Sequence, residues 1–159
     1  MRETGGVTKV DAGTSVPPIG ALERDRLARA LDRDHVVAGM LFGSQAAGHA
    51  GALSDIDIAV WLDPELPGEE RIALRRDLSL AAIEALGTDE IDMVVLNGAP
   101  PLLRHRVLAG GTRLFDRDPR ARVRLETKAM LDYFDTAPLR QVLAAGRRRR
   151  IEEERFGRR

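Results

Sequence analysis

Hydrophobic positions along the chain follow helical and strand patterns in turn. Leu22, Leu27 and Leu31 recur at helical spacing, which predicts an amphipathic helix over about residues 19–33. Short apolar runs that contain β-branched residues, such as HVVAGMLF and DIDIAVWL, instead predict buried strands. The expected strands cover residues 35–42, 55–62, 90–96 and 112–115. The other expected helices cover about residues 69–86, 100–108, 118–134 and 138–154.

Proline and glycine mark the ends of these elements. Pro64 and Pro67 separate the second strand from the helix that follows, and Gly87 ends that helix. Strands that alternate with helices predict an α/β (α+β) fold, with a small mixed β-sheet flanked by helices and a helical C-terminus. The connection from Gly43 to Ser54 is too short for a regular crossover helix, so one or two helical turns are expected there.

Composition divides the chain into three segments. Residues 1–18 are rich in Gly, Thr and Pro without a hydrophobic period, and are interpreted as a flexible N-terminal tail. Residues 19–138 hold the alternating elements of one domain, and residues 139–159 form a basic C-terminal helix or tail. This last segment has eight arginines and three glutamates, whereas the rest of the chain has 17 basic and 22 acidic side chains. Such a distribution indicates a polar partner or a contact within the chain, and the alternative is a solvated helix end.

The composition also excludes several classes of site. The 159 residues are 43% hydrophobic, as expected of one globular domain, and the absence of cysteine excludes disulfides and thiolate metal sites. His35, His49 and His105 lie far apart in the sequence and form no metal-ligating pair. There is neither a long apolar segment near the N-terminus nor a run of about 18 apolar residues, so a cytoplasmic protein is expected.

Two aspartates at the start of the second strand are the first candidates for chemistry. Asp55 and Asp57 are two residues apart, so in a strand their side chains project from the same face. Two carboxylates about 6.6 Å apart repel by about 2.5 kcal/mol at an effective dielectric of about 20, and a divalent cation would reverse the sign of that interaction. Magnesium favours carboxylates combined with substrate phosphates and water. An isolated Asp-x-Asp, in contrast, is usually a solvated strand start or turn.

Further residues make a catalytic interpretation stronger than the pair alone. Asp92 lies in the third strand and can complete a three-carboxylate site if that strand is adjacent to the second one. Such a site could hold two metal ions about 3.5–4 Å apart. Gly43 and Ser44, ten residues before Asp55, would let the backbone and a hydroxyl approach phosphates at the start of a helical turn. The chain has no GxxxxGK[ST] motif, so this is not a Walker A loop.

The spacing of Gly43-Ser44 and Asp55-x-Asp57 resembles the signature of the polymerase-beta nucleotidyltransferase superfamily. The small size, the SDIDIAV run and Asp92 are similar to its minimal nucleotidyltransferase (MNT) branch. The segments PPLLRHRVLAGGTRLFDRDP and LDYFDTAPLR also fit that branch. The similarity covers about residues 20–145 and implies a polymerase-beta-like fold.

The resemblance also implies an activity and a partner. Members of the MNT branch often act as antitoxins encoded beside a helical HEPN ribonuclease toxin, and they transfer AMP from ATP to a tyrosine of that toxin. For this chain it implies Asp55, Asp57 and Asp92 as ligands of two Mg²⁺ ions, with Asp92 as the third carboxylate. It places Gly43 and Ser44 at the ATP triphosphate. The expected role is that of a type VII-like antitoxin that contacts neither membrane nor DNA.

One position departs from the pattern of that branch. The segment after Gly-Ser usually contains an arginine, as in GSxARG, whereas this chain reads GSQAAG with Ala47 at the arginine position. Arg75 or Arg76, on the helix before the third strand, are candidates to replace it, and surface solvation is the alternative role for both. Two other functions stay open at this stage. One is transfer to a small molecule, as in aminoglycoside nucleotidyltransferases, and the other is a binding antitoxin without catalysis.

Overall fold

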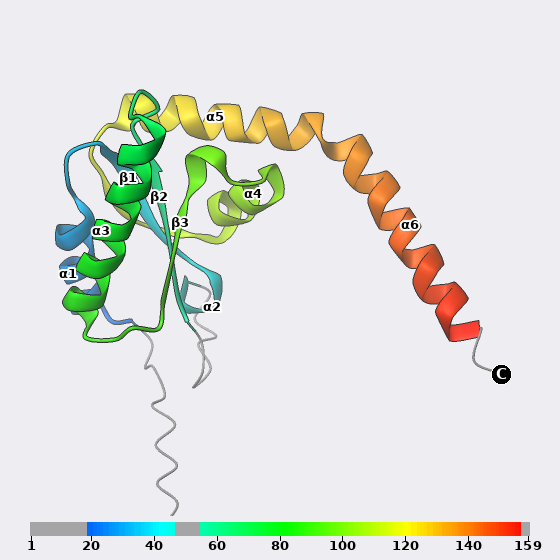
Figure 1. The fold of residues 1–159 in the computed structure, drawn as a ribbon, viewed down its shortest axis with the longest axis horizontal. Helices are drawn as coiled ribbons and strands as arrows, with labels where there is room; N and C mark the ends of the chain where they lie inside the picture. The colour runs from blue at the N-terminus through cyan, green and yellow to red at the C-terminus, as the bar shows by residue number, and fades with distance from the viewer. Residues whose placement is uncertain (1–18, 47–54, 157–159) are drawn as a thin grey trace, which may run out of the picture.

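A four-stranded mixed sheet carries helices on both of its faces (Figure 1). The computed structural model describes residues 19–46 and 55–156, so the tail predicted over residues 1–18 lies outside the described residues. The strands are β1 (Val36–Phe42), β2 (Ile56–Leu62), β3 (Ile91–Val95) and β4 (Thr112–Asp116). The helices are α1 (Ala21–Leu31), α2 (Gly43–Ala46), α3 (Gly68–Leu86), the 3₁₀ helix η1 (Leu96–Gly98), α4 (Pro101–Gly110), α5 (Pro119–Asp135) and α6 (Ala137–Phe156).

The predicted strands and helices are all present, and the predicted fold class is confirmed. The short helical turn expected after Gly43 is α2. The first strand begins one residue later than predicted, because His35 has a left-handed backbone with φ of 63°. Gly87 ends α3 in the same left-handed conformation, with φ of 70°, where a glycine costs least. Asp118 caps α5, since its side chain accepts a hydrogen bond from the backbone N–H of Ala121 at 2.9 Å.

The strand order is β3-β2-β1-β4, and β1 runs antiparallel to both of its neighbours. β2 and β3 are parallel, and α3 connects them. In this parallel pair Asp57 lies opposite Asp92, and Ile58 lies opposite Met93. At the other end of β2, the Asn97 side chain accepts from the backbone N–H of Leu62 and donates to its carbonyl, at 2.9 and 2.8 Å. These two bonds continue the pairing of β2 beyond the end of β3.

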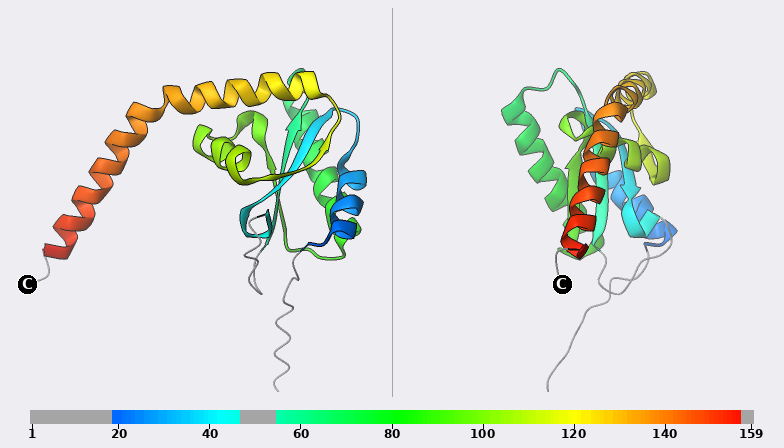
Figure 2. Two further views of the ribbon diagram at one scale, coloured as in Figure 1. Left: turned by 180° about the vertical axis from the view of Figure 1, so that it is seen from behind. Right: turned by 90° about the vertical axis from the view of Figure 1, so that its right-hand side faces the viewer.

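Each face of the sheet buries a separate hydrophobic core. α1 and α3 cover one face, and α4 and α5 cover the other (Figures 1 and 2). The first core contains Leu27, Leu31, Val36, Leu41, Ile56, Ile58, Val60, Leu62, Leu78, Ala82 and Met93. The second contains Val37, Ala38, Met40, Ala59, Trp61, Leu96, Val107, Ala121 and Ala129. Because side chains alternate along a strand, β2 contributes Ile58 to the first core and Trp61 to the second.

The C-terminal helix α6 stands away from the sheet and its covering helices (Figures 1 and 2). It follows α5 after a sharp change of direction at Thr136, whose hydroxyl donates to the Asp132 carbonyl at 2.9 Å. Among the described residues, no helix is both long and apolar enough to cross a membrane.

Candidate active site

The three predicted carboxylates come together at the start of β2 and in β3. Asp57 and Asp92 are register partners in the parallel pair, so the adjacency on which the three-carboxylate prediction depends is present. Their neighbours Ile58 and Met93 are buried in the core under α1 and α3. Asp57 and Asp92 therefore project from the opposite face, on the side of α4 and α5. Asp55 immediately precedes β2 and is exposed.

The electrostatics of Asp57 reflect this crowding of negative charge. The pKa of Asp57 is raised above its usual 3.8, first because the carboxyl is partly buried, and then because Asp92 and Asp55 carry negative charge nearby. All three causes disfavour a third negative charge at this point. A cation or a cationic group bound among the three carboxylates would reverse the two Coulombic causes.

Gly43 is packed against the same carboxylate. It is the first residue of α2, has φ of 71°, and its neighbour Phe42 is the register partner of Asp57 in the β1–β2 pair. A Cβ at this position would overlap Oδ2 of Asp57 and lie 2.9 Å from its Cγ. Both the backbone conformation and the close approach therefore require glycine. Ser44 follows in the first turn of α2, so the four predicted residues Gly43, Ser44, Asp55 and Asp57 are close together in the fold.

The carboxylates fit a magnesium site that is completed by a nucleotide. In the part of the chain that the structure describes, no three His, Asp or Glu side chains form a metal-binding cluster on their own. Magnesium does not need such a cluster, because it keeps several waters and is commonly held by one or two carboxylates together with substrate phosphates. The pair of Asp57 and Asp92, with Asp55 next to it, supplies the oxygen ligands that this metal prefers.

The proposed replacements for the missing arginine lie on the wrong side of the sheet. Arg75 and Arg76 belong to α3, which packs against the face opposite to Asp57 and Asp92. The Nε of Arg75 donates to the Met93 carbonyl at 2.9 Å, and Arg76 lies 3.7 Å from Asp77 on its own helix. Neither is placed to take over a phosphate contact. Ala47 itself lies outside the described residues.

A separate surface depression contains none of the predicted site residues. It has a volume of about 790 Å³ and lies at the opposite end of β1 and β2, where His35, Asp63 and Arg117 are among its lining residues. Arg117 is paired there with Asp32 at 3.1 Å and with Asp34 at 2.5 Å. Charged groups that already have partners, and the distance along the strands from Asp57, argue against this depression as the catalytic site.

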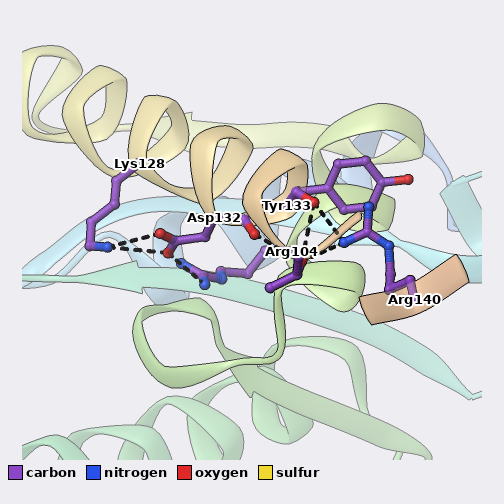
Figure 3. A network of polar contacts seen from close by, with 6 residues as sticks. Arg104, Lys128, Asp132, Tyr133 and Arg140 are labelled. Atoms are coloured by element: carbon purple, nitrogen blue, oxygen red, sulfur yellow. Dashed lines mark hydrogen bonds and ion pairs between the residues drawn. The ribbon is translucent and has the colours of Figure 1, made fainter. Parts of the chain in front are cut away.

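Sequence reasoning missed the residues that connect α4, α5 and α6 (Figure 3). The rings of His105 and Tyr133 stack with centroids 3.8 Å apart at 11°, and the Arg140 guanidinium carbon lies 3.8 Å from the Tyr133 centroid. Both groups cannot occupy one face of the ring at that distance, so Tyr133 is sandwiched between them. Arg140 also donates to the Tyr133 carbonyl and to the Thr136 hydroxyl. The only tyrosine of the chain, seven residues before an arginine, was the available signal.

A second polar contact ties α4 to α5. Arg104, the only charged side chain buried among the described residues, donates to Asp132 at 2.9 Å, and Lys128 donates to the same carboxylate at 3.1 Å (Figure 3). These two cations hold the pKa of Asp132 below its usual 3.8. We refer to this contact and the Tyr133 sandwich together as the α4–α6 joint.

Comparison with known proteins agrees with this geometry. The family model described as Polymerase beta, Nucleotidyltransferase matches residues 26–120, which include all five predicted site residues. No curated protein sequence matches the chain.

Two solved structures resemble the chain over a larger share of its length. One is the tri-AMPylated HEPN toxin of Shewanella oneidensis in complex with an MNT antitoxin. It contains a chain that is 24% identical, with a TM-score of 0.59, and the match covers 79% of this chain and 95% of that one. The other is a toxin–antitoxin structure with AMP-PNP, with 26% identity, a TM-score of 0.53, and coverage of 82% and 96%. The first likeness, at 24% identity, shows a shared fold.

Proposed function

Since this chain belongs to the polymerase beta nucleotidyltransferase family, we propose that it transfers AMP from ATP to a hydroxyl of a partner protein. The partner that we infer is a HEPN-type toxin, and the acceptor is a tyrosine of that toxin. Modification of the toxin would make this chain the antitoxin of a toxin–antitoxin pair in the cytoplasm, where ATP is available. The similar structures of a HEPN toxin carrying AMP groups with an MNT antitoxin, and of a toxin–antitoxin complex with AMP-PNP, support this choice.

One observation carries the proposal: Asp57 and Asp92 lie side by side on one face of the β2–β3 pair, next to Gly43, which has no room for a side chain. In a purely structural role, this arrangement would only lower stability, because burial and the neighbouring charges both disfavour ionised Asp57. A cation bound there together with a triphosphate would offset this unfavourable charge. It therefore argues against the alternative of an antitoxin that binds without catalysis.

The residues divide the reaction between them. Asp55 and Asp57 would hold Mg²⁺, with Asp92 as a further ligand, and the metal would supply charge stabilisation at the phosphates. Gly43 and Ser44 would receive the triphosphate at the start of α2. The acceptor oxygen forms a bond to the α-phosphorus while the bond between that phosphorus and the bridging oxygen breaks, and pyrophosphate leaves. The hydroxyl proton passes to the carboxylate of Asp92, which acts as the general base.

The test combines this chain with a candidate HEPN-type partner protein, Mg²⁺ and each of the four nucleoside triphosphates in separate reactions. We expect an increase in the intact mass of the partner by one or more AMP units with ATP, and none when EDTA replaces Mg²⁺. Tandem mass spectrometry should place the modification on tyrosine. Modification of an aminoglycoside instead of the protein would favour a small-molecule acceptor. Tight binding of the partner with no mass change under any condition would contradict the proposed catalysis.

A further inference from the structure

The end of α5 and the first turns of α6 have an unusually apolar surface. We call residues 131–156 the arm. Half of the large hydrophobic side chains that are exposed in the described part of the chain fall between residues 131 and 143. Each of the five is more than half exposed: Leu131, Phe134, Leu139, Val142 and Leu143. Scattered exposed apolar residues are ordinary on a protein surface, whereas a concentration of this kind marks an interaction surface.

The apolar positions on α6 have the spacing of a helix that binds in a groove. Leu139, Val142 and Leu143 are related as i, i+3 and i+4, so they form one stripe along the helix. A helix that places such a stripe in an apolar groove is a recurrent mode of protein recognition. The domain of this chain does not supply the groove, because α6 stands away from it (Figures 1 and 2).

Charge distinguishes a partner protein from a second copy of this chain. Residues 137–156 contain six arginines and three glutamates, so the helix has an excess of positive charge. Pairing two such helices would bring the same excess positive charge together, whereas an acidic partner would complement it. The occupant that fits the arm is therefore a protein with an apolar groove bordered by acidic side chains.

The position of the arm connects it to the candidate active site. α6 lies on the side of the sheet covered by α4 and α5, which is the side that Asp57 and Asp92 face. From α5 the helix runs to the level of α2, and the views of Figures 1 and 2 agree on this height. A protein bound along the arm would therefore be held beside the end of the sheet where the carboxylates lie.

We propose that the arm is the docking element for the protein that receives the nucleotide. This inference rests on the proposed function and adds to it the surface that selects the acceptor. The apolar stripe supplies the binding energy, and the arginines favour an acidic partner and accelerate its association. The α4–α6 joint holds the arm at the angle that presents the acceptor hydroxyl to the site.

The experiment compares two neighbouring substitutions that add the same charge. Val142→Glu places a carboxylate on the stripe, whereas Gln141→Glu places one on the other side of the helix, about 160° from Leu139. The affinity of each full-length variant for the candidate HEPN-type partner protein is measured by calorimetry in EDTA without nucleotide. We expect Val142→Glu to weaken binding by about tenfold or more, as for an interface anchor, and Gln141→Glu to change it by less than about twofold. Circular dichroism confirms that both variants keep their helices.

The outcomes separate docking from catalysis. In transfer assays, Val142→Glu should raise the KM for the protein acceptor and leave the KM for ATP unchanged. Equal affinity of the two variants for the partner would overturn the docking role. Sedimentation of the free chain tests the other occupant: loss of a dimer in Val142→Glu with unchanged affinity for the partner would assign the stripe to a second copy. If wild-type protein binds through the stripe but never transfers AMP, the docking inference stands and the proposed catalysis fails.

Discussion

The two faces of the central sheet have different tasks, and β2 shows this within seven residues. On one face Ile56, Ile58 and Val60 are buried against α1 and α3, with no polar side chain among them. On the other face the strand begins with Asp57 and ends with Trp61 under α4 and α5. One face thus supplies stability, whereas the other gives up part of that stability at its first position to gather negative charge. Substitutions of neighbouring residues on β2 should therefore have different effects, one mainly on activity and the other mainly on stability.

The face of the sheet that carries Asp57 and Asp92 is called the carboxylate face. The largest expected effect is a loss of activity when a carboxylate of this face is replaced. Asp57→Asn keeps the shape of the side chain but removes a charge that would hold Mg²⁺. We expect transfer of AMP to fall on the order of 10³-fold, measured as the initial rate of modification of the partner protein. The melting temperature of the metal-free variant should not decrease, because the repulsion from Asp55 and Asp92 is removed. A variant that retains full transfer would show that the carboxylate face is not catalytic.

The adjacent residue should show the reverse behaviour. Ile58 is completely buried in the core under α1 and α3. Ile58→Ala should lower the free energy of unfolding by about 2–5 kcal/mol in urea titrations. At a temperature where the variant is still folded, its transfer rate per folded molecule should stay within about twofold of wild type, since the side chain faces away from Asp57. A large loss of rate without loss of stability would mean that the two faces are coupled.

Gly43 tests whether backbone conformation or side-chain space matters more at the site. Gly43→Ala should lower stability by about 1–2 kcal/mol through its left-handed backbone, and should also weaken Mg·ATP binding at least about tenfold because the Cβ displaces Asp57. Gly87→Ala is the matched control. Gly87 has φ of 70° and nothing within 4 Å of an added Cβ, so only the loss of stability is expected. Calorimetric titration with Mg·ATP distinguishes the two variants, and equal nucleotide affinity would remove Gly43 from the site.

The smallest expected effect is a pH dependence of stability. The pKa of Asp57 is higher in the folded than in the unfolded protein, so the folded state binds this proton more tightly. Its contribution to stability therefore becomes less favourable as the pH rises above 3.8 and through the raised folded pKa, and is constant beyond it. The difference in melting temperature between Asp57→Asn and wild type, in EDTA, should be smallest near pH 3.8 and increase toward neutral pH. A difference that does not change over this range would contradict the assignment.

Asp132 has the opposite sign and serves as an internal comparison in the same scans. Its pKa is lowered by Lys128 and Arg104, so its stabilising contribution is present above pH 3.8 and is lost as the pH falls through the lowered folded pKa. Measuring Asp132→Asn beside Asp57→Asn therefore separates the α4–α6 joint from the carboxylate face. Equal pH profiles for the two variants would contradict at least one of the two assignments, and the sign of the shared profile would show which one.

Local sequence pattern was sufficient for the elements but not for their pairing. Among the described residues, the apolar runs and the breaks at Pro64, Pro67 and Gly87 predicted every strand and α-helix, because these signals act within a few residues. The 3₁₀ helix η1 was not predicted. The alignment of Asp57 with Asp92 depends instead on strand order and on the length of α3, which no local pattern encodes. The sequence therefore predicted a three-carboxylate site only if β2 and β3 are adjacent.

The residues that the sequence did not predict are those whose partners lie on a different helix or strand. Nothing near Arg104 in the sequence indicates that it is buried, because its partner Asp132 is 28 residues away. His105 was considered in the sequence only as a possible metal ligand, because its ring partner Tyr133 is 28 residues away on α5. The suggestion that Arg75 or Arg76 serves the phosphates failed for the same reason, since the face that a helix covers is a property of the sheet. The roles of the five candidate site residues remain predictions for the variants described above.

Because α6 is long, a small rotation at the α4–α6 joint produces a large displacement of its far end. A helix of 20 residues is about 30 Å long, so a rotation of about 10° at its base moves its far end by roughly 5 Å. The Tyr133 sandwich is only a few ångströms wide, and a displacement of one ring by a fraction of that width would produce such a rotation. Small changes at His105 or Arg140 are thus amplified along the length of α6.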